Sequence, residues 1–212
     1  MIESTKSSIK KSVGRPADQA KRDAIMEAAS TLFLADGFSA VSMDKIAGEA
    51  GVAKPTIYRW FGTKSELFAA MLEEKCANYL IEIDQTNDPA LDAQTLLSQA
   101  GEQFLSLIFS PEASALHRTV VNEVPRNPEF GQLFFESGIK VGAQWLHRKL
   151  SLLVDRGDIS VEDPLVSARD LLSLWRDMPQ LLTELGVEKF DEEQLALHSK
   201  RVTAVMLKAW AP

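Results

Sequence analysis

The sequence predicts an all-α fold: a small N-terminal three-helix domain containing a helix-turn-helix, followed by a larger C-terminal helical domain. Apolar residues recur every three or four positions along most of the 212 residues, which is the period of an amphipathic helix. After Leu67 no segment shows the apolar–polar alternation of a strand. Proline and glycine divide this part into predicted helices at residues 64–84, 91–109, 112–124, 128–156, 163–185 and 191–210.

The helix-turn-helix is predicted between Ser42 and Phe61. Ile46 and Ala47 form the apolar face of a short helix, and Gly51 follows its end, where glycine tolerates a left-handed backbone. Ile57 can cover that face from a second short helix, so the two helices are expected to cross. The second helix presents side chains suited to phosphate oxygens and base edges in a DNA major groove, namely Lys54, Thr56, Tyr58 and Arg59. A helical hairpin with a solvated polar face is the alternative for this pattern taken alone.

The flanking helices have their own signals. Residues 17–36 carry Ile25, Ala29 and Phe33 at helical spacing, which predicts the first helix. Thr63 followed three residues later by Glu66 predicts a capping box at the start of the fourth helix.

A family resemblance rests on consecutive motifs: IMEAASTLFLADGFSAVSM, then IAGEAGV, then KPTIYRWF followed by TKSELF. Together, residues 22–68 resemble the DNA-binding domain of the TetR family of bacterial transcriptional regulators. The resemblance implies that Thr56, Tyr58 and Lys64 hold the DNA backbone and that Lys54 and Pro55 reach bases. Trp60 can pack internally or lie along the sugar–phosphate backbone. Ala53 departs from the family, which usually has a serine or another capping residue there, and this loss costs about 1 kcal/mol of helix stability.

Charge is distributed unevenly along the chain. Residues 1–64 contain 10 Lys and Arg against 7 Asp and Glu, a net charge of +3, whereas residues 65–212 carry −10. Such asymmetry indicates a nucleic-acid face at one end. We expect residues 1–16 to form a flexible basic arm, residues 17–64 the DNA-binding domain, and residues 65–212 the C-terminal domain. Arg15, in a Gly-Arg-Pro triplet resembling minor-groove binders, is a candidate DNA contact, and a solubilising tail is the alternative.

Several classes of function are excluded. No apolar run approaches the roughly 18 residues that would span a membrane, and no signal-peptide core is present, so we expect a cytoplasmic protein. The single cysteine, Cys76, excludes an internal disulfide and falls on an apolar stripe, which favours a buried thiol. No histidine has a glutamate three positions earlier, and no Gly-x-Ser-x-Gly motif occurs, so we expect no enzyme, cofactor or metal site.

The last two predicted helices have wide apolar faces, which are suited to a four-helix bundle between two copies of the chain. The TetR resemblance likewise implies that this pair is the homodimer interface. The predicted interface residues are Leu172, Leu195, His198, Val202, Val205 and Met206. A monomer in which both faces serve one core is the alternative.

The middle helices are predicted to enclose a ligand pocket. Leu116 to Gly138 resembles the C-terminal domain of AefR-like regulators, whose domains diverge widely and do not specify a ligand. Residues 128–156 contain Gly131, Gly138 and Gly142, a run that leaves room for a close helix or a ligand. The predicted lining consists of aromatic and flexible apolar residues with two polar ones: Phe104, His117, Asn122, Phe134, Trp145, Trp175 and Met178.

The functional expectation is a sequence-specific DNA-binding transcriptional regulator. It would act as a homodimeric repressor on double-stranded DNA, at a palindromic operator, and would be released by a small apolar or amphipathic effector. The alternative is a non-enzymatic helical DNA-architectural or protein-interaction module without small-molecule control.

Overall fold

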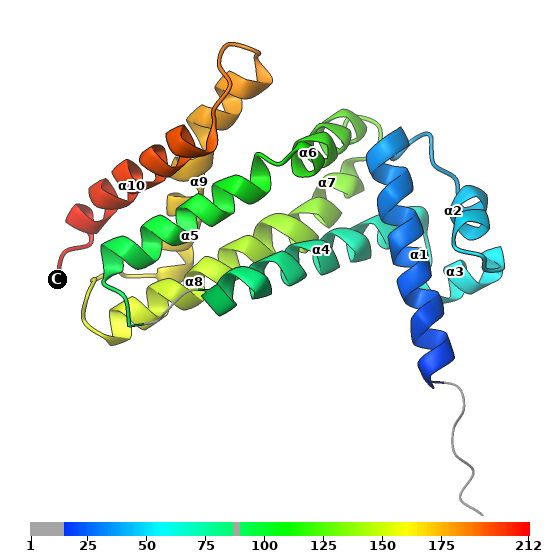
Figure 1. Ribbon diagram of the computed structural model, residues 1–212, viewed down its shortest axis with the longest axis horizontal. Helices are drawn as coiled ribbons and strands as arrows, with labels where there is room; N and C mark the ends of the chain where they lie inside the picture. The colour runs from blue at the N-terminus through cyan, green and yellow to red at the C-terminus, as the bar shows by residue number, and fades with distance from the viewer. Residues whose placement is uncertain (1–14, 87–89) are drawn as a thin grey trace, which may run out of the picture. The chain divides into compact units, whose positions relative to one another are not determined.

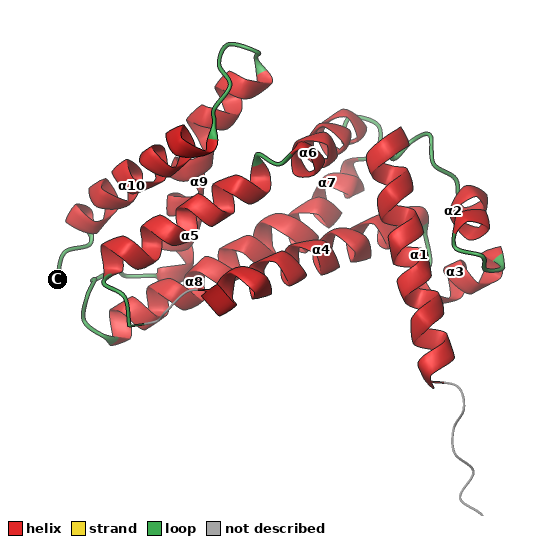
Figure 2. Ribbon diagram, viewed as in Figure 1, coloured by secondary structure: helices red, strands yellow, loops and turns green. Residues whose placement is uncertain are grey.

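The computed structural model describes residues 15–86 and 90–212, with side chains from 18 to 80 and from 90 to 212. The predicted all-α class is confirmed, since the described part of the chain contains helices, turns and loops but no strand (Figure 2). The chain divides into two compact units, the first ending at Leu67 and the second beginning at Phe68. The long helix α4 crosses that division.

The first unit is built from α1 (Arg15–Asp36), α2 (Met43–Glu49), α3 (Lys54–Phe61) and the first turn of α4 (Lys64–Thr86). Helix α1 begins two residues before the predicted start. Each element contributes apolar side chains that are at most 1% exposed: Ile25, Ala29, Phe33, Ile46, Ile57 and Leu67. Burial on this scale holds two very short helices in place, because helices of seven and eight residues are not stable alone.

Local capping explains where these short helices begin and end. The Ser42 hydroxyl accepts a hydrogen bond from the Lys45 backbone N–H at 3.2 Å and starts α2. Gly51 adopts φ +63°, which allows the chain to turn sharply between α2 and α3. At α4, the Thr63 N–H donates to the Glu66 carboxylate at 2.7 Å and the Glu66 N–H donates to the Thr63 hydroxyl at 3.1 Å. The predicted capping box is therefore present.

The second unit contains the remainder of α4 and seven further helical elements in chain order. These are α5 (Ala93–Ile108), α6 (Pro111–Glu123), α7 (Pro128–Phe134), η1 (Phe135–Ile139), α8 (Lys140–Asp155), α9 (Pro164–Glu184) and α10 (Glu192–Ala209). Each predicted helical segment is found within two residues of its expected limits. One segment differs in helix type: residues 128–156 were predicted as one continuous α-helix, but they contain the π-helical turn η1.

Helix α5 lies at the centre of this unit and packs against α8, α9 and α10 (Figure 1). Gly101 permits the close approach, because a Cβ atom there would lie 2.7 Å from the Trp175 ring and would overlap the Ser199 hydroxyl. Buried hydrogen bonds fix the same contact. The Ser199 hydroxyl donates to the Ser98 carbonyl at 3.0 Å, and the Trp175 Nε1–H donates to the Thr203 hydroxyl at 3.3 Å.

Candidate nucleic-acid interface and ligand cavity

Helix α3 has one buried face and one exposed face. Ile57 is 0% exposed and anchors the helix in the first unit's core, whereas the neighbouring Tyr58 is 46% exposed. Pro55 and Arg59 are also exposed, and Lys54, Thr56 and Trp60 are half-buried. The predicted contact residues of α3 are thus brought together on the outer side of one short helix, where phosphate oxygens and base edges can reach them. Ala53 provides no side-chain cap, and Pro55 in the first turn has no N–H that needs one.

Lys54 has a partner on α2. Its ammonium donates to the Asp44 carboxylate at 2.7 Å, and the side chains of Lys54 and Asp44 are 42% and 71% exposed. The hydrogen bond to Asp44, together with that carboxylate's charge, raises the pKa of Lys54 above its ordinary value, so Lys54 is cationic at neutral pH. Asp44 was not anticipated from the sequence. Its proximity means that the charge of Lys54 is partly balanced before any DNA is bound.

Lys64 is held differently from the exposed residues of α3. Its ammonium donates to the carbonyls of Phe38 at 2.8 Å and Val41 at 2.9 Å, and lies 4.2 Å from the centroid of the Phe38 ring. The side chain therefore ties the start of α4 to the α1–α2 connection. The ammonium is thus surrounded by two carbonyls and an aromatic face, and the phosphate contact expected of Lys64 stays a prediction.

The N-terminal prediction falls mostly outside the described residues. Arg15 is the first residue of α1, but its side chain is not among those described. Residues 1–14, which make up most of the predicted arm, also lie outside the described part.

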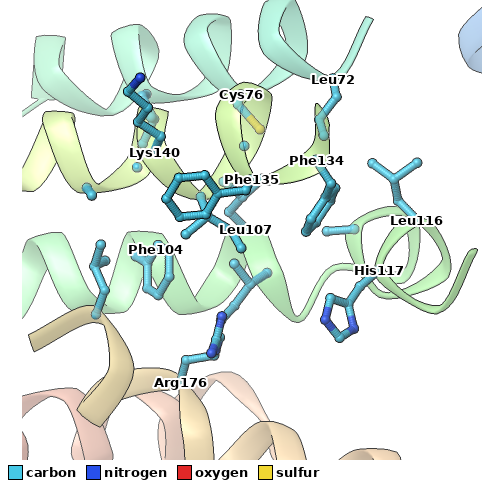
Figure 3. A pocket seen from close by; sticks show the side chains of 18 of the residues that line it. Leu72, Cys76, Phe104, Leu107, Leu116, His117, Phe134, Phe135, Lys140 and Arg176 are labelled. Carbon is cyan, nitrogen blue, oxygen red and sulfur yellow. The ribbon is translucent and has the colours of Figure 1, made fainter. Parts of the chain in front are cut away.

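The second unit contains a partly open cavity of about 370 Å³ (Figure 3). Three walls are largely apolar and come from α4, from α5, and from the α6–α8 region. The lining residues on these walls include Leu72, Cys76, Leu80, Phe104, Leu107, Ile108, Leu116, Phe134, Phe135 and Ile139. Burial raises the pKa of the Cys76 thiol to about 11, so this thiol stays protonated at neutral pH.

The π-helical turn η1 forms part of this lining. A π turn places one more residue in the turn than an α-helix does, and such turns are frequent at functional sites. Here it allows Phe134, Phe135, Gly138 and Ile139 all to line the cavity. Gly142, one turn further on, also lines it, and a Cβ atom added there would meet no other atom within 4 Å. The predicted role of the glycine run in leaving space is consistent with this arrangement.

The fourth wall comes from α9 and, beside the apolar Leu172, is mainly polar. Arg169, Ser173, Arg176 and Gln180 line the cavity at spacings of three and four residues, so they form one stripe along the helix. Figure 3 shows the Arg176 side chain extending from α9 towards Leu107. The cavity is therefore amphipathic, with one polar wall facing three apolar ones.

A polar cluster of His117, Gln180 and Glu184 lies beside the cavity, and His117 and Gln180 line it. His117 lies 3.0 Å from the Glu184 carboxylate, and the Gln180 side-chain amide donates to that carboxylate at 2.7 Å. The same His117 and Gln180 also line a neighbouring cavity of about 300 Å³, together with Asn122.

The predicted lining is corrected at three positions. Trp145 and Trp175 are at most 1% exposed and belong to the buried core of the second unit, to which α4, α5, α8, α9 and α10 contribute. Met178 is 59% exposed and lies on the outer face of α9. Phe104, His117 and Phe134 line the large cavity, and Asn122 lines its neighbour. Helical periodicity finds apolar faces but cannot tell which aromatic residue meets a cavity. Arg176 of the α9 stripe could be named from the sequence as a polar group of the pocket, whereas Arg169, Ser173 and Gln180 were not anticipated.

The last two helices expose an apolar face. Leu174, Met178, Leu181 and Leu185 recur along α9 at spacings of four, three and four residues, and Leu197 and Val205 are exposed on α10. Of the predicted dimer residues, Val205 is 61% exposed, and His198, Val202 and Met206 are half-buried. Leu172 and Leu195 are corrected: both are buried within their own unit, which removes them from the exposed face.

Within residues 15–86 and 90–212, no three His, Cys, Asp or Glu residues come together as metal ligands. None of the helices in that part of the chain has the length and apolar character needed to cross a membrane.

Comparison with known proteins gives two family matches. Residues 25–71 match the model of bacterial regulatory proteins of the tetR family, and residues 95–212 match the AefR-like transcriptional repressor C-terminal domain. The first match is shifted by three residues from the predicted segment 22–68, whereas the second extends well beyond Leu116 to Gly138 and covers more than half of the chain.

Individual relatives agree. The transcriptional activator FasR of Mycolicibacterium smegmatis is 36% identical over 93 residues, which are 44% of this chain and 42% of FasR. The solved structure of the flavonoid-responsive regulator FrrA is 31% identical, with a TM-score of 0.71 over 92% of this chain and 98% of FrrA. A TetR-family regulator from Mesorhizobium loti MAFF303099 has a TM-score of 0.78 over 92% of this chain and 98% of its own, and its 22% identity shows the fold alone. The chain belongs to the TetR family of DNA-binding transcriptional regulators, with an AefR-like C-terminal domain.

Proposed function

We propose that the protein is a homodimeric repressor that binds a palindromic operator through α3 and is released when a small amphipathic molecule enters the cavity of the second unit. The observation that carries this proposal is the combination, in one chain, of an exposed recognition helix and a lined cavity of about 370 Å³. Cavities of this size are typical of ligand sites.

The exposed side of α3 supports operator recognition. Tyr58 and Arg59 are free to reach the backbone of a duplex, and Lys54 can reach a base edge once it leaves Asp44. A single short helix makes few base contacts. Two copies on a two-fold axis would double them, with half-sites about 34–36 Å apart or at a multiple of that spacing.

The exposed apolar face of α9 and α10 supports dimer formation. Leu181, Leu185 and Leu197 are each about half exposed or more in the single chain. Covering such a face against its own copy removes it from water, at about 25 cal/mol for each Å² of apolar surface. A two-fold axis through these helices would form a four-helix bundle.

Helix α4 supports coupling between ligand and DNA. Its capped first turn belongs to the DNA-binding unit, and three of its later residues, Leu72, Cys76 and Leu80, line the cavity. A ligand that binds the DNA-incompetent state more tightly shifts the population towards it. The free energy of this shift equals the difference between the ligand's binding free energies for the two states, which in allosteric proteins is about 1–3 kcal/mol.

The test begins with footprinting of the purified protein on the DNA upstream of its own gene, followed by calorimetry of a releasing compound with and without that DNA. Reciprocity requires operator DNA to weaken ligand binding by the factor by which the ligand weakens DNA binding. Equal affinities would contradict allosteric release. A ligand bound more tightly on DNA would instead indicate activation or co-repression, and FasR is an example of an activator among the relatives.

A further inference from the structure

We infer that the cavity of the second unit is built for an amphipathic anion: an apolar body carrying a carboxylate, a sulfonate or an ionised phenol. This inference deepens the proposed function and rests on it, since it names the chemical class of the effector. The anionic group is assigned to the α9 wall, between Arg169 and Arg176, and the apolar body to the opposite walls.

The apolar walls select the body of the ligand. Phe104 on α5 and Phe134 and Phe135 at the α7–η1 junction line the space together with Leu and Ile side chains. Figure 3 shows Phe104, Phe134 and Phe135 around the same space as Cys76 and Leu107. A ligand that fills this part gains by removing apolar surface from water and needs no hydrogen bonds there.

The sign of the charge on the lining selects the head group. Among the described residues that line the cavity, none is acidic, whereas three are basic: Lys140, Arg169 and Arg176. This contrasts with residues 65–212 as a whole, which carry a net charge of −10. A cationic stripe inside an acidic domain concentrates positive potential where the ligand binds. Ser173, between the two arginines on the same stripe, adds a hydroxyl donor.

The carboxylates near Lys140 and Arg176 do not prevent the two arginines from binding an anionic ligand. Arg176 contacts Asp177 at 3.0 Å, but both side chains are more than a third exposed, and such surface pairs are weak and exchangeable. Arg169 has no ion-pair or hydrogen-bond partner among the described residues. Lys140 pairs with Glu136 at 2.6 Å, and Figure 3 shows its ammonium turned away from the cavity centre. Glu184, at the end of the polar stripe, is engaged by His117 and Gln180. The two arginines are therefore the groups that can bind an entering anion, and guanidinium matches a planar carboxylate in geometry.

The test uses two probes with the same ring system. The first, 8-anilinonaphthalene-1-sulfonate, carries an anionic sulfonate, and the second, N-phenyl-1-naphthylamine, lacks it. Both become fluorescent in apolar surroundings, so the affinity of each is measured by fluorescence titration of the full-length protein without DNA. We expect the sulfonate to bind more tightly. Arg169→Gln together with Arg176→Gln should weaken the sulfonate about tenfold, as expected for the loss of charge-assisted hydrogen bonds, and leave the neutral probe within about twofold.

Two further variants locate the binding. Lys189→Gln is the matched control, because Lys189 is an exposed cation in the α9–α10 connection and does not line the cavity. It should leave both affinities unchanged. Gly142→Leu places a side chain in open space within the cavity and should abolish binding of both probes. Replacing a helical glycine also favours the helix, so loss of binding through unfolding is not expected.

Three results would overturn the inference. These are equal affinities for the two probes, equal weakening of both by the double arginine variant, and retention of sulfonate binding in Gly142→Leu. None of them depends on DNA. The cavity could accept neutral ligands while footprinting still supports operator binding, and operator binding could fail while the anion preference holds, so the two proposals fail separately.

Discussion

Two adjacent residues of α3 show how a single short helix is divided between stability and recognition. Ile57 is fully buried, so Ile57→Ala should lower the free energy of unfolding by about 2–5 kcal/mol through lost burial and a residual cavity. Tyr58 is exposed, so Tyr58→Ala should change that free energy by no more than about 0.5 kcal/mol while weakening binding to operator DNA. Urea unfolding and fluorescence anisotropy on the footprinted DNA measure the two quantities. Unchanged DNA affinity in folded Tyr58→Ala would remove α3 from the interface.

Cys76 gives a second prediction at the scale of one residue. The thiolate is the reactive form, and burial holds the pKa of this thiol near 11, so alkylation by iodoacetamide should be slow at pH 7 and accelerate as the pH rises towards 11. Cys76 is the chain's single cysteine, so mass spectrometry reports its labelling without interference. A cavity ligand should slow the labelling further. Rapid alkylation at neutral pH, comparable to that of the unfolded chain in urea, would show that the thiol is not enclosed.

At the scale of elements, η1 makes the cavity wall sensitive to the length of the helix. Deleting Gly138 should convert the π turn to an α turn and remove the one extra residue that widens the helix at the wall. Phe135 and Ile139, which lie in that turn, would then leave their present positions on the wall. We expect far-UV circular dichroism and DNA binding to be retained and N-phenyl-1-naphthylamine fluorescence to be lost.

Gly138→Ala is the control for that deletion. A Cβ atom at this position would lie 3.5 Å from Leu72 Cδ2, which is ordinary contact, and it leaves the register unchanged. The alanine variant should bind the probe like the unaltered chain. Full probe binding after the deletion would mean that the π turn is not needed for the wall.

At the scale of the whole molecule, oligomeric state should depend on the exposed face of α9 and α10. Leu181→Lys combined with Val205→Lys introduces two charges on a face that is apolar in the single chain, and burying unpaired charges between two copies is strongly unfavourable. Sedimentation should show monomers, with operator binding weakened because two half-sites are no longer bound together. Val187→Lys changes an equally exposed residue after the end of α9 and should remain dimeric. A dimer in both variants would place the interface elsewhere.

The sequence alone was sufficient for features with local causes. The helix limits were predictable because caps and breaks lie within a few residues of the ends they define, as at Thr63 and Glu66. The helix-turn-helix was predictable for the same reason. Gly51 makes the turn between α2 and α3, and Ile57 packs against the helix just before that turn, so both contacts are local in the sequence. Alternating exposure along α3 then follows from helical geometry, which is why its outer residues could be named in advance.

Only the tertiary structure decided what each apolar or charged side chain meets. Trp175 and Phe134 are both aromatic residues on the apolar side of a predicted helix. Trp175 nevertheless packs against Gly101 and donates to Thr203 in the core, whereas Phe134 lines the cavity. Lys64 lies over Phe38, 26 residues away in the chain, and no local pattern indicates that contact. The physical reason is shared. Amphipathic periodicity reports that a face is apolar, whereas the choice among core, cavity and partner surface depends on how distant helices pack against one another.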